Sequence, residues 1–267
     1  MWGEAIRHTI NSLPGWLSIL LTVLILTAPV LALFFVVRRF YPAALHEGNA
    51  DILATTTKTT SLCYGFFLGF VMSVLWQTYN KADDIVTQEA SHLTMLADNS
   101  YGLGSQDGAR LRRDIAHYIT AVREKEWPAM REGKSCPEAA TALDNLLSDL
   151  ENFSPKGDVA LSAYAAITAT AMNLYNDRKA RLGLLESSIS DVMRVFITLG
   201  YLIDVLLIAL VYSQRKRMHL VLTALFGTMV AFNIGIAANL DFPFSGEVSI
   251  SSDPLVQGNL AHLESAS

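Results

Sequence analysis

The feature that most constrains this chain is an uninterrupted apolar segment near its start. Residues 16–37, a run of 22, contain no charged side chain, and Arg38-Arg39 follows directly. As an α-helix this run rises about 33 Å at 1.5 Å per residue, enough to cross the roughly 30 Å hydrocarbon core of a bilayer. A secretory signal peptide has a shorter apolar region and a more basic start than Arg7 alone provides. We therefore predict a transmembrane helix over 16–37.

Three further apolar segments predict a four-span membrane protein. They cover residues 61–79, 195–212 and 220–239, and their one charged side chain is Asp204. Each segment alone could be a buried helix of a soluble protein. Four such segments, in two pairs on either side of a polar stretch, favour two transmembrane hairpins. The composition agrees, because 17% of the residues are charged, against about 25% in soluble proteins.

The polar stretch between the hairpins has the pattern of helices. Apolar residues recur at three-to-four spacing in two series: Ala82, Val86, Ala90, Leu93 and Ala97, then Leu111, Ile115, Tyr118 and Val122. The first series predicts that the second span continues past the membrane without a break. A long helix beginning at Asp158 is expected to run into the third span. No segment alternates with the period of two that strands require.

The predicted fold class is therefore an all-α membrane protein, with two transmembrane helical hairpins flanking a soluble helical bundle. The expected parts are an N-terminal segment, a first hairpin, a soluble helical domain, a second hairpin and a C-terminal tail, at residues 1–15, 16–79, 80–194, 195–239 and 240–267.

Several classes of function find little support in the sequence. A net charge of −5 argues against nucleic-acid binding, which requires a basic surface. Cys63 and Cys136 have no metal-ligand spacing. Glu89-x-x-His92 and Asp114-x-x-His117 resemble halves of a di-iron carboxylate site, but one has Asp in place of Glu and both are expected on solvated faces. We predict no enzymatic activity, no cofactor and no metal site.

The second span carries two stripes of side chains with a spacing of four. Small residues form the first, which permits close approach of two membrane helices: Ser61, Gly65, Gly69 and Ser73. Leu62, Phe66 and Phe70 form an apolar ridge beside it. Such a ridge usually faces lipid or the helix bundle. The alternative is a hydrophobic pore constriction, which gates by losing its water.

The third and fourth spans carry polar residues inside the predicted membrane. Asp204 is either an ion or proton site, or a protonated carboxyl that is hydrogen-bonded to a residue such as Thr228 on the fourth span. Asn233 is expected to form a hydrogen bond between helices. Asn233 lies within a second stripe of small residues, which consists of Gly227, Ala231 and Gly235. We expect this stripe to pack against another helix.

Four stretches outside the central part of the spans carry a resemblance to a known family. They are Trp76–Tyr79 leading to Glu89-Ala90, Glu126–Met130, Asn176–Leu182 and Leu240–Gly246. Together they are similar to the bestrophin-like family of four-span bacterial membrane proteins, over residues 38 to about 255. The most specific stretch follows the last span, and it makes Asp241, Pro243, Phe244 and Gly246 the expected family motif. The resemblance implies a place in the bacterial inner membrane.

That family is in turn distantly similar to the bestrophin anion channels, which are pentamers with a pore lined by the second span. Their pore helix contains Phe-x-Leu-Gly-Phe, which matches residues 66–70 here. The resemblance thus implies a pore neck at Leu62, Phe66 and Phe70. Bestrophins also bind calcium through Pro-Phe-Gly-Glu and an acidic run. Here Pro243–Glu247 has an inserted serine, and no acidic run follows.

The distribution of positive charge predicts the orientation. The loops 38–60 and 213–219 carry six Lys or Arg residues: Arg38, Arg39, Lys58, Arg215, Lys216 and Arg217. The opposite side has six near the membrane as well. Because short loops weigh most in the positive-inside rule, we expect these loops in the cytoplasm and residues 80–194 outside it. The resemblance to bestrophins implies the reverse.

Two functions from different classes remain at this point. The first is a homo-oligomeric ion channel in the lipid bilayer, a pentamer by resemblance, with the second span lining its neck. The second is a non-conducting sensor or scaffold whose helical domain binds a partner. The channel requires a symmetric oligomer, because four helices in one chain leave no wide pore. The scaffold has no such requirement.

Overall fold

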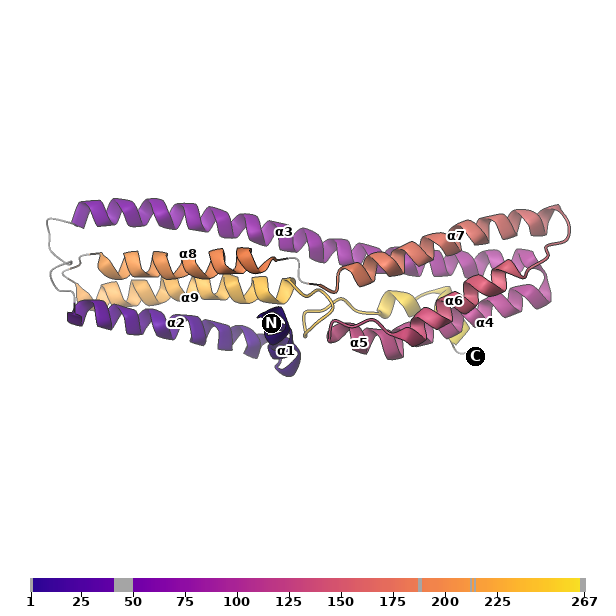
Figure 1. Ribbon diagram of the computed structural model, residues 1–267, viewed down its shortest axis with the longest axis horizontal. Coiled ribbons are helices and arrows are strands. Elements are labelled where there is room, and N and C mark those ends of the chain that lie inside the picture. Colours follow the sequence, from indigo (N-terminus) through magenta and orange to yellow (C-terminus); the bar gives the residue numbers. More distant parts are fainter. Residues whose placement is uncertain (1, 41–49, 187–188, 212, 214, 265–267) are drawn as a thin grey trace. The chain divides into compact units, whose positions relative to one another are not determined.

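The computed structural model describes residues 2–40, 50–186, 189–211, 213 and 215–264. Within these ranges all regular elements are helical (Figure 1), which confirms the predicted all-α class. Residues 41–49 of the first predicted loop, and residue 214 of the second, lie outside the described residues.

The chain divides into two compact units, which we describe separately. The span unit comprises Met1–Gln77 and Ser187–Asp241, and the helical unit comprises Thr78–Glu186 and Phe242–Ser267. Among the described residues, four helices are long and apolar enough to cross a membrane, as the sequence predicts: Gly15–Val37, the helix that begins at Ala50, Asp191–Leu210 and Arg217–Leu240.

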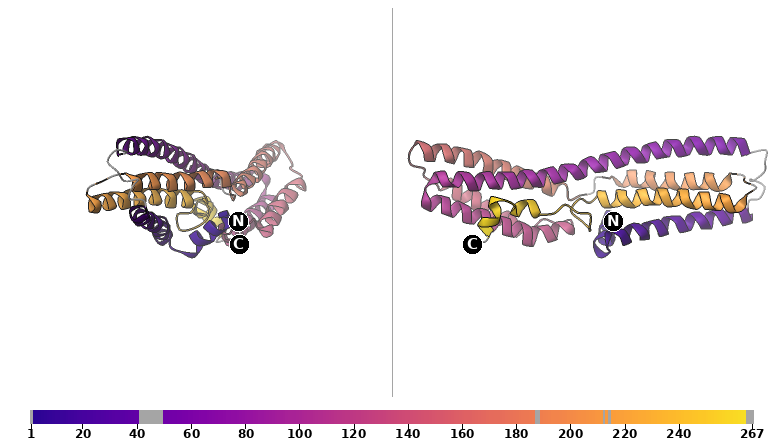
Figure 2. Two further views of the ribbon diagram at one scale, coloured as in Figure 1. Left: turned by 60° about the vertical axis from the view of Figure 1, so that its left-hand side comes forward. Right: turned by 180° about the vertical axis from the view of Figure 1, so that it is seen from behind.

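The span unit is built on close packing of three helices. Its elements are α1 (Trp2–Ser12), α2 (Gly15–Phe40), the first part of α3 (Ala50–Asn99), α8 (Asp191–Leu210) and α9 (Lys216–Leu240). Helices α2, α8 and α9 lie side by side in all views (Figures 1 and 2). Their contacts surround a buried cluster of Val30, Tyr64, Tyr201, Val205 and Val230.

Helix α3 is continuous through both units, as the spacing of Ala82, Val86, Ala90, Leu93 and Ala97 predicts. It begins at Ala50, well before the predicted start of the second span at residue 61. All five of these side chains are buried. The residues of the second predicted series, from Leu111 to Val122, are buried as well.

The helical unit surrounds one large apolar core. Its remaining elements are α4 (Ser105–Ala121), α5 (Trp127–Arg131), α6 (Pro137–Glu151), α7 (Asp158–Gly183), α10 (Asn259–Glu264), the short helices η3 (Ser100–Leu103) and η5 (Asp253–Val256), and a π-helical turn, η4 (Val122–Glu126). The turn η4 joins α4 to α5. Leucines 93, 96, 111, 143 and 146 are among the fully buried core residues.

One prediction about the helices is wrong. The helix that begins at Asp158 does not run into the third span, because α7 ends at Gly183 and α8 begins at Asp191. The hydroxyl of Ser190 accepts a hydrogen bond from the backbone N–H of Met193 and so caps the first turn of α8. A capping serine followed by an acidic first turn is a start signal within the chain.

Candidate functional site: the outer face of α3 and the groups that hold it

The ridge on α3 is the most exposed apolar surface of the span unit. The exposed fractions of Leu62, Phe66 and Phe70 are 75%, 82% and 60%. Since a helix turns about 100° per residue, a spacing of four places all three on one face. The ridge therefore lies on the outside of a single chain and is uncovered among the described residues.

The small-residue stripe of α3 is also uncovered within one chain. A Cβ atom added at Gly65 or Gly69 meets nothing within 4 Å. Ser73 is exposed, whereas Ser61 is half-buried. Close helix packing at Gly65, Gly69 and Ser73 is thus not made within the chain, and it stays a prediction for contacts between copies.

The side of α3 that lies opposite to the ridge contacts α8 through the ring of Tyr64 and through two hydrogen bonds. The Tyr64 hydroxyl donates to the carbonyl of Ile197 at 2.8 Å. The ring of Tyr64 fills the space beside Gly200, where an added Cβ would lie 2.6 Å from the Tyr64 Cε2 atom. Three residues earlier on α3, the Ser61 hydroxyl donates to Asp204 Oδ1 at 2.6 Å. Gly200 is therefore required by the close approach of Tyr64.

Asp204 is fully buried between α3 and α8. Its hydrogen-bond partner is Ser61 on the second span, whereas the sequence pointed to Thr228, which is exposed. The other carboxyl oxygen of Asp204, Oδ2, is buried and has no hydrogen-bond partner among the described residues. A buried intramembrane carboxyl with an unpaired oxygen is a candidate ion or proton site, and this alternative stays open.

The predicted small residues of α9 pack against α2, and its predicted polar residue bonds within α9. An added Cβ at Gly227 would lie 3.4 Å from Val30, and one at Gly235 would lie 3.6 Å from Ile19 and Thr22. Ala231 is fully buried. The described residues of one chain show no interhelical hydrogen bond of Asn233; its amide donates to the Met229 carbonyl of the same helix at 2.9 Å, and the interhelical bond stays a prediction.

Asp241, the first residue of the family motif, directly follows α9 and binds residues just before and at the start of α8. Its carboxylate accepts hydrogen bonds from the backbone N–H of Ile189 at 3.0 Å and from the Arg194 guanidinium at 2.8 Å. Asp241 is only 2% exposed. It thus connects the C-terminal end of α9 with the beginning of α8.

The rest of the motif lies in the helical unit. The Phe244 ring packs edge-on against Trp127, with 5.9 Å between the ring centres. The Pro243 carbonyl accepts from the N–H of Ile250, and the Ser245 hydroxyl donates to the Arg131 carbonyl. Gly246 has φ of 79°, a conformation that favours glycine. These contacts give the motif a structural role.

A cluster of buried charges, which we call the ionic cluster, lies in the core of the helical unit. Arg181 is fully buried, and its Nε and Nη2 donate to Glu89 at 2.6 and 3.0 Å. Nη2 also donates to Glu126 at 3.0 Å. The carboxylate of Glu126 accepts a further hydrogen bond from Arg178. Tyr118 donates to Glu89 at 2.7 Å. The cluster joins α3, α4, η4 and α7.

The charges of the ionic cluster balance one another. Burial disfavours the charged form of Arg181, but the carboxylates of Glu89 and Glu126 outweigh burial and raise its pKa. Burial and the neighbouring Glu89 raise the pKa of the Tyr118 hydroxyl, which stays protonated as a donor. Two arginines and two glutamates therefore form a neutral, hydrogen-bonded group.

The prediction that both partial di-iron motifs lie on solvated faces is wrong for Glu89. Its two oxygens bind Arg181 and Tyr118. His92 Nδ1 lies 2.5 Å from Asp177 Oδ2, so the histidine has a carboxylate partner of its own. In the described part of the chain, no three His, Cys, Asp or Glu side chains gather as a metal site.

Sequence reasoning missed the ionic cluster, although its residues stood in the stretches that carry the family resemblance. Glu89 follows Trp76–Tyr79, Glu126 precedes Trp127, and Arg178 and Arg181 lie in Asn176–Leu182. The available signal was position: Glu89 lies beside Ala90 within the apolar series of α3. Glu89 also lies three residues after Val86 and four before Leu93, which is the spacing of the buried face, and a charge in that register indicates a buried pair.

One comparison with known proteins gave a match. The bestrophin-like domain matches residues 24–255, which include the second part of the first span, the other three spans and most of the helical unit. A search of curated proteins gave no match. A search of solved structures gave none either. Because the domain covers most of the chain, this multi-pass membrane protein belongs to the bestrophin-like family.

Proposed function

We propose that the protein is a homo-oligomeric ion channel whose pore neck is lined by Leu62, Phe66 and Phe70 of α3. The observation that carries this proposal is the exposure of the whole ridge on one face of a helix that is fixed from behind by Tyr64 and Ser61. A ring of such faces around a symmetry axis would form an apolar constriction. By resemblance to bestrophins, the ring has five copies. We assign the chain transport and no catalysis.

A second surface, on α7, supports association between copies outside the span unit. Residues 159–176 contain no charged side chain. Large apolar residues on this helix are exposed, among them Leu161, Met172 and Tyr175. Together with Ala165 and Thr168 they follow the alternating spacing of four and three that is typical of helix pairing. Lipid cannot cover this face if the helical unit lies in water, so a protein partner is required.

The orientation is part of the proposal. The positive charges of Arg39, Lys58 and Arg215 favour cytoplasmic loops between the spans of each hairpin. Glu132, Lys134 and Ser135 form an exposed turn between α5 and α6. A reporter that is active only outside the cytoplasm, inserted at Lys134, should be active. Activity of a cytosol-only reporter there would support the bestrophin orientation.

Oligomeric mass and ion flux together test the function. The purified chain in lipid nanodiscs should have a mass that is a multiple of 29.3 kDa, five-fold by resemblance. Liposomes that contain it should pass ions. Ala165→Glu/Met172→Glu should weaken the oligomer by placing charge in the α7 contact, whereas Thr141→Glu, on the exposed face of α6, is the matched control.

Two outcomes would overturn the channel. A monomeric mass would remove the ring that the neck requires. A well-folded oligomer that passes no ions at any voltage or salt composition would favour the alternative, a sensor or scaffold whose helical unit binds a partner through α7.

A further inference from the structure

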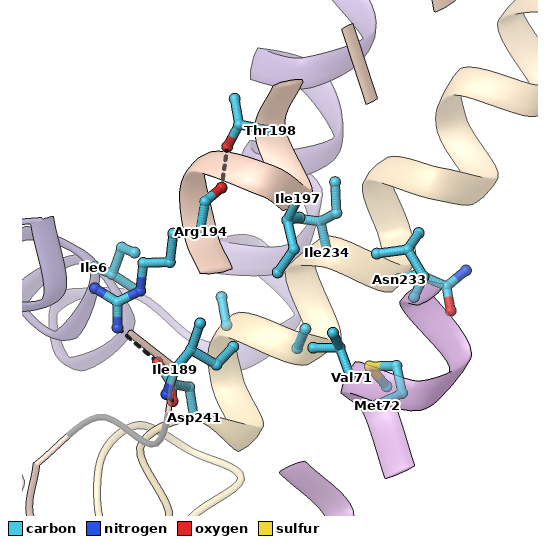
Figure 3. Close-up of a pocket in the computed structure, with 13 residues that line it drawn as sticks. Ile6, Val71, Met72, Ile189, Arg194, Ile197, Thr198, Asn233, Ile234 and Asp241 are labelled. Atoms are coloured by element: carbon cyan, nitrogen blue, oxygen red, sulfur yellow. Dashed lines mark hydrogen bonds and ion pairs between the residues drawn. The ribbon is translucent and has the colours of Figure 1, made fainter. Parts of the chain in front are cut away.

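A cavity in the span unit lies behind the proposed neck. It is walled by α1, α3, α8 and α9 and by the residues just before α8 (Figure 3). Its α3 wall is Leu68, Val71 and Met72. At 100° per residue these three project from the side of α3 opposite to Phe66. The cavity is thus the space between the neck helix and the two helices that stand behind it.

Most side chains that wall this cavity are apolar. Besides Arg194 and Asp241, its polar side chains are Thr198 and Asn233, which donate to the Arg194 and Met229 carbonyls of their own helices. Ile197 and Ile234 lie at its deeper end, and Arg194 and Asp241 form an ion pair at its other end, which is the end of the spans (Figure 3). Ala237 and Ala238 on α9 leave the space open, because their side chains extend no further than Cβ. The cavity therefore has a mainly apolar interior, a charged pair at one end, and an asparagine whose amide is bonded within its own helix.

Water is a poor occupant for such a space. The cavity measures about 140 Å³ and is partly open. An apolar cavity of about 150 Å³ in a soluble protein stays dry and binds apolar molecules the size of benzene. The surroundings of the span unit supply apolar chains in large excess. A segment of an alkyl chain fits the volume, and the rest of the molecule can extend through the open side.

We propose that this cavity binds the acyl chain of a membrane amphiphile, with its chain between Leu68 and Ile234 and its polar part at the Arg194–Asp241 end. The charge on Arg194 is already balanced by Asp241 and Asp191, at 2.8 and 3.5 Å. The site therefore recognises the chain, and a strongly anionic head group is not required. Phospholipid and free fatty acid share this chemistry.

The bound chain supports α3 on the same side as Tyr64 and Ser61, but further along the helix. Tyr64 and Ser61 fix α3 near the middle of the span unit, whereas Leu68–Met72, one to two turns later, borders the cavity. An occupant there acts as a spacer between α3 and α9. The inference concerns binding, and it holds whether or not the chain conducts ions.

Photolabelling tests the site. The full-length protein is reconstituted with phosphatidylcholine that carries a diazirine on one acyl chain, and in a parallel arm with a diazirine fatty acid. Adducts should concentrate in residues 68–72, 194–198 and 233–238. Ala238→Phe, which fills the cavity, should reduce these adducts at least five-fold and leave labelling of the exposed residues 20–25 of α2 unchanged. The arm with stronger labelling identifies the source of the chain.

Ala32→Phe is the matched control, because Ala32 is exposed on α2 and does not line the cavity. If Ala238→Phe does not give a monodisperse protein, the smaller Ala238→Leu is measured in the same way. Cavity labelling that equals that of residues 20–25, or that persists in a folded Ala238 variant, would overturn the site. A labelled but silent protein would refute the channel alone.

Discussion

The two units of this protein place polar and apolar side chains in opposite ways. In the span unit Phe66 is almost fully exposed and Asp204 is fully buried. In the helical unit leucines fill the core, and most of the surface is polar, as in a soluble domain. The difference follows from what surrounds each unit, since lipid accepts apolar side chains and water does not. The two exceptions in the helical unit, the buried ionic cluster and the exposed apolar α7 face, are therefore the informative positions.

Loss of a charge from the ionic cluster should produce the largest effect. Arg181→Met leaves the buried Glu89 without its cationic partner and removes one of the two arginines that bind Glu126, and breaking a buried pair costs about 3–5 kcal/mol. We expect the helical unit to unfold at a markedly lower temperature, as measured by scanning fluorimetry in detergent. Arg110→Met is the control, because its contact with Asp149 is exposed and long, at 3.8 Å. Equal melting temperatures of the two variants would contradict a structural role for the cluster.

The contact between Tyr64 and Gly200 tests the span unit in the same way. Gly200→Ala places a Cβ 2.6 Å from the ring of Tyr64, whose hydroxyl is bound to Ile197. Overpacking of this kind costs about 1–3 kcal/mol, and we expect lower thermal stability with α3 displaced from α8. Gly65→Ala, where nothing lies within 4 Å in one chain, should leave the protomer unchanged. If both variants melt alike, α3 is not held as described.

The sequence predicts periodic features well and long-range pairs poorly. The continuity of α3 follows from the spacing of Ala82 to Ala97, and the exposure of the ridge is consistent with its regular spacing. Glu89 was misplaced because its partner Arg181 lies 92 residues away, and no local pattern records that distance. For Asp204 one of two alternatives from the sequence is a hydrogen bond to a threonine such as Thr228 on the adjacent hairpin helix, whereas the fold brings Ser61 of the first hairpin to it. Cavities such as the one beside Ala238 depend on packing and leave no periodic signal.

A smaller effect is expected from Asp114, at the contact between α4 and α6. Burial and the neighbouring Asp149 raise the pKa of Asp114 from 3.8 to about 6. Between these pH values the folded state binds more protons than the unfolded state, so stability falls as the pH rises through this window. Because Asp114 is only half-buried, solvent screens the effect, and we expect about 1 kcal/mol or less.

Asp114→Asn should therefore raise the melting temperature at pH 7.5 and lose this advantage near pH 4. Asp144→Asn, on the exposed face of α6, is the control. A gain from Asp114→Asn that is the same at both pH values would show that the carboxyl pair does not set the pH dependence of the helical unit.

The neck is tested most directly by the ion conductance of Phe66→Ala/Phe70→Ala in reconstituted bilayers, measured beside the oligomeric mass of the same sample. In an apolar constriction the barrier comes from the size and apolarity of the side chains. The double variant should therefore conduct more than the wild type, or lose its gating, as a folded oligomer. Because both side chains are exposed in one chain, the variant should not suffer the loss of about 3–5 kcal/mol that follows removal of a buried phenylalanine. The assignment of α3 as the pore helix would be contradicted if wild type and variant form equally well-folded oligomers and conduct identically. It would also be contradicted if neither of them conducts.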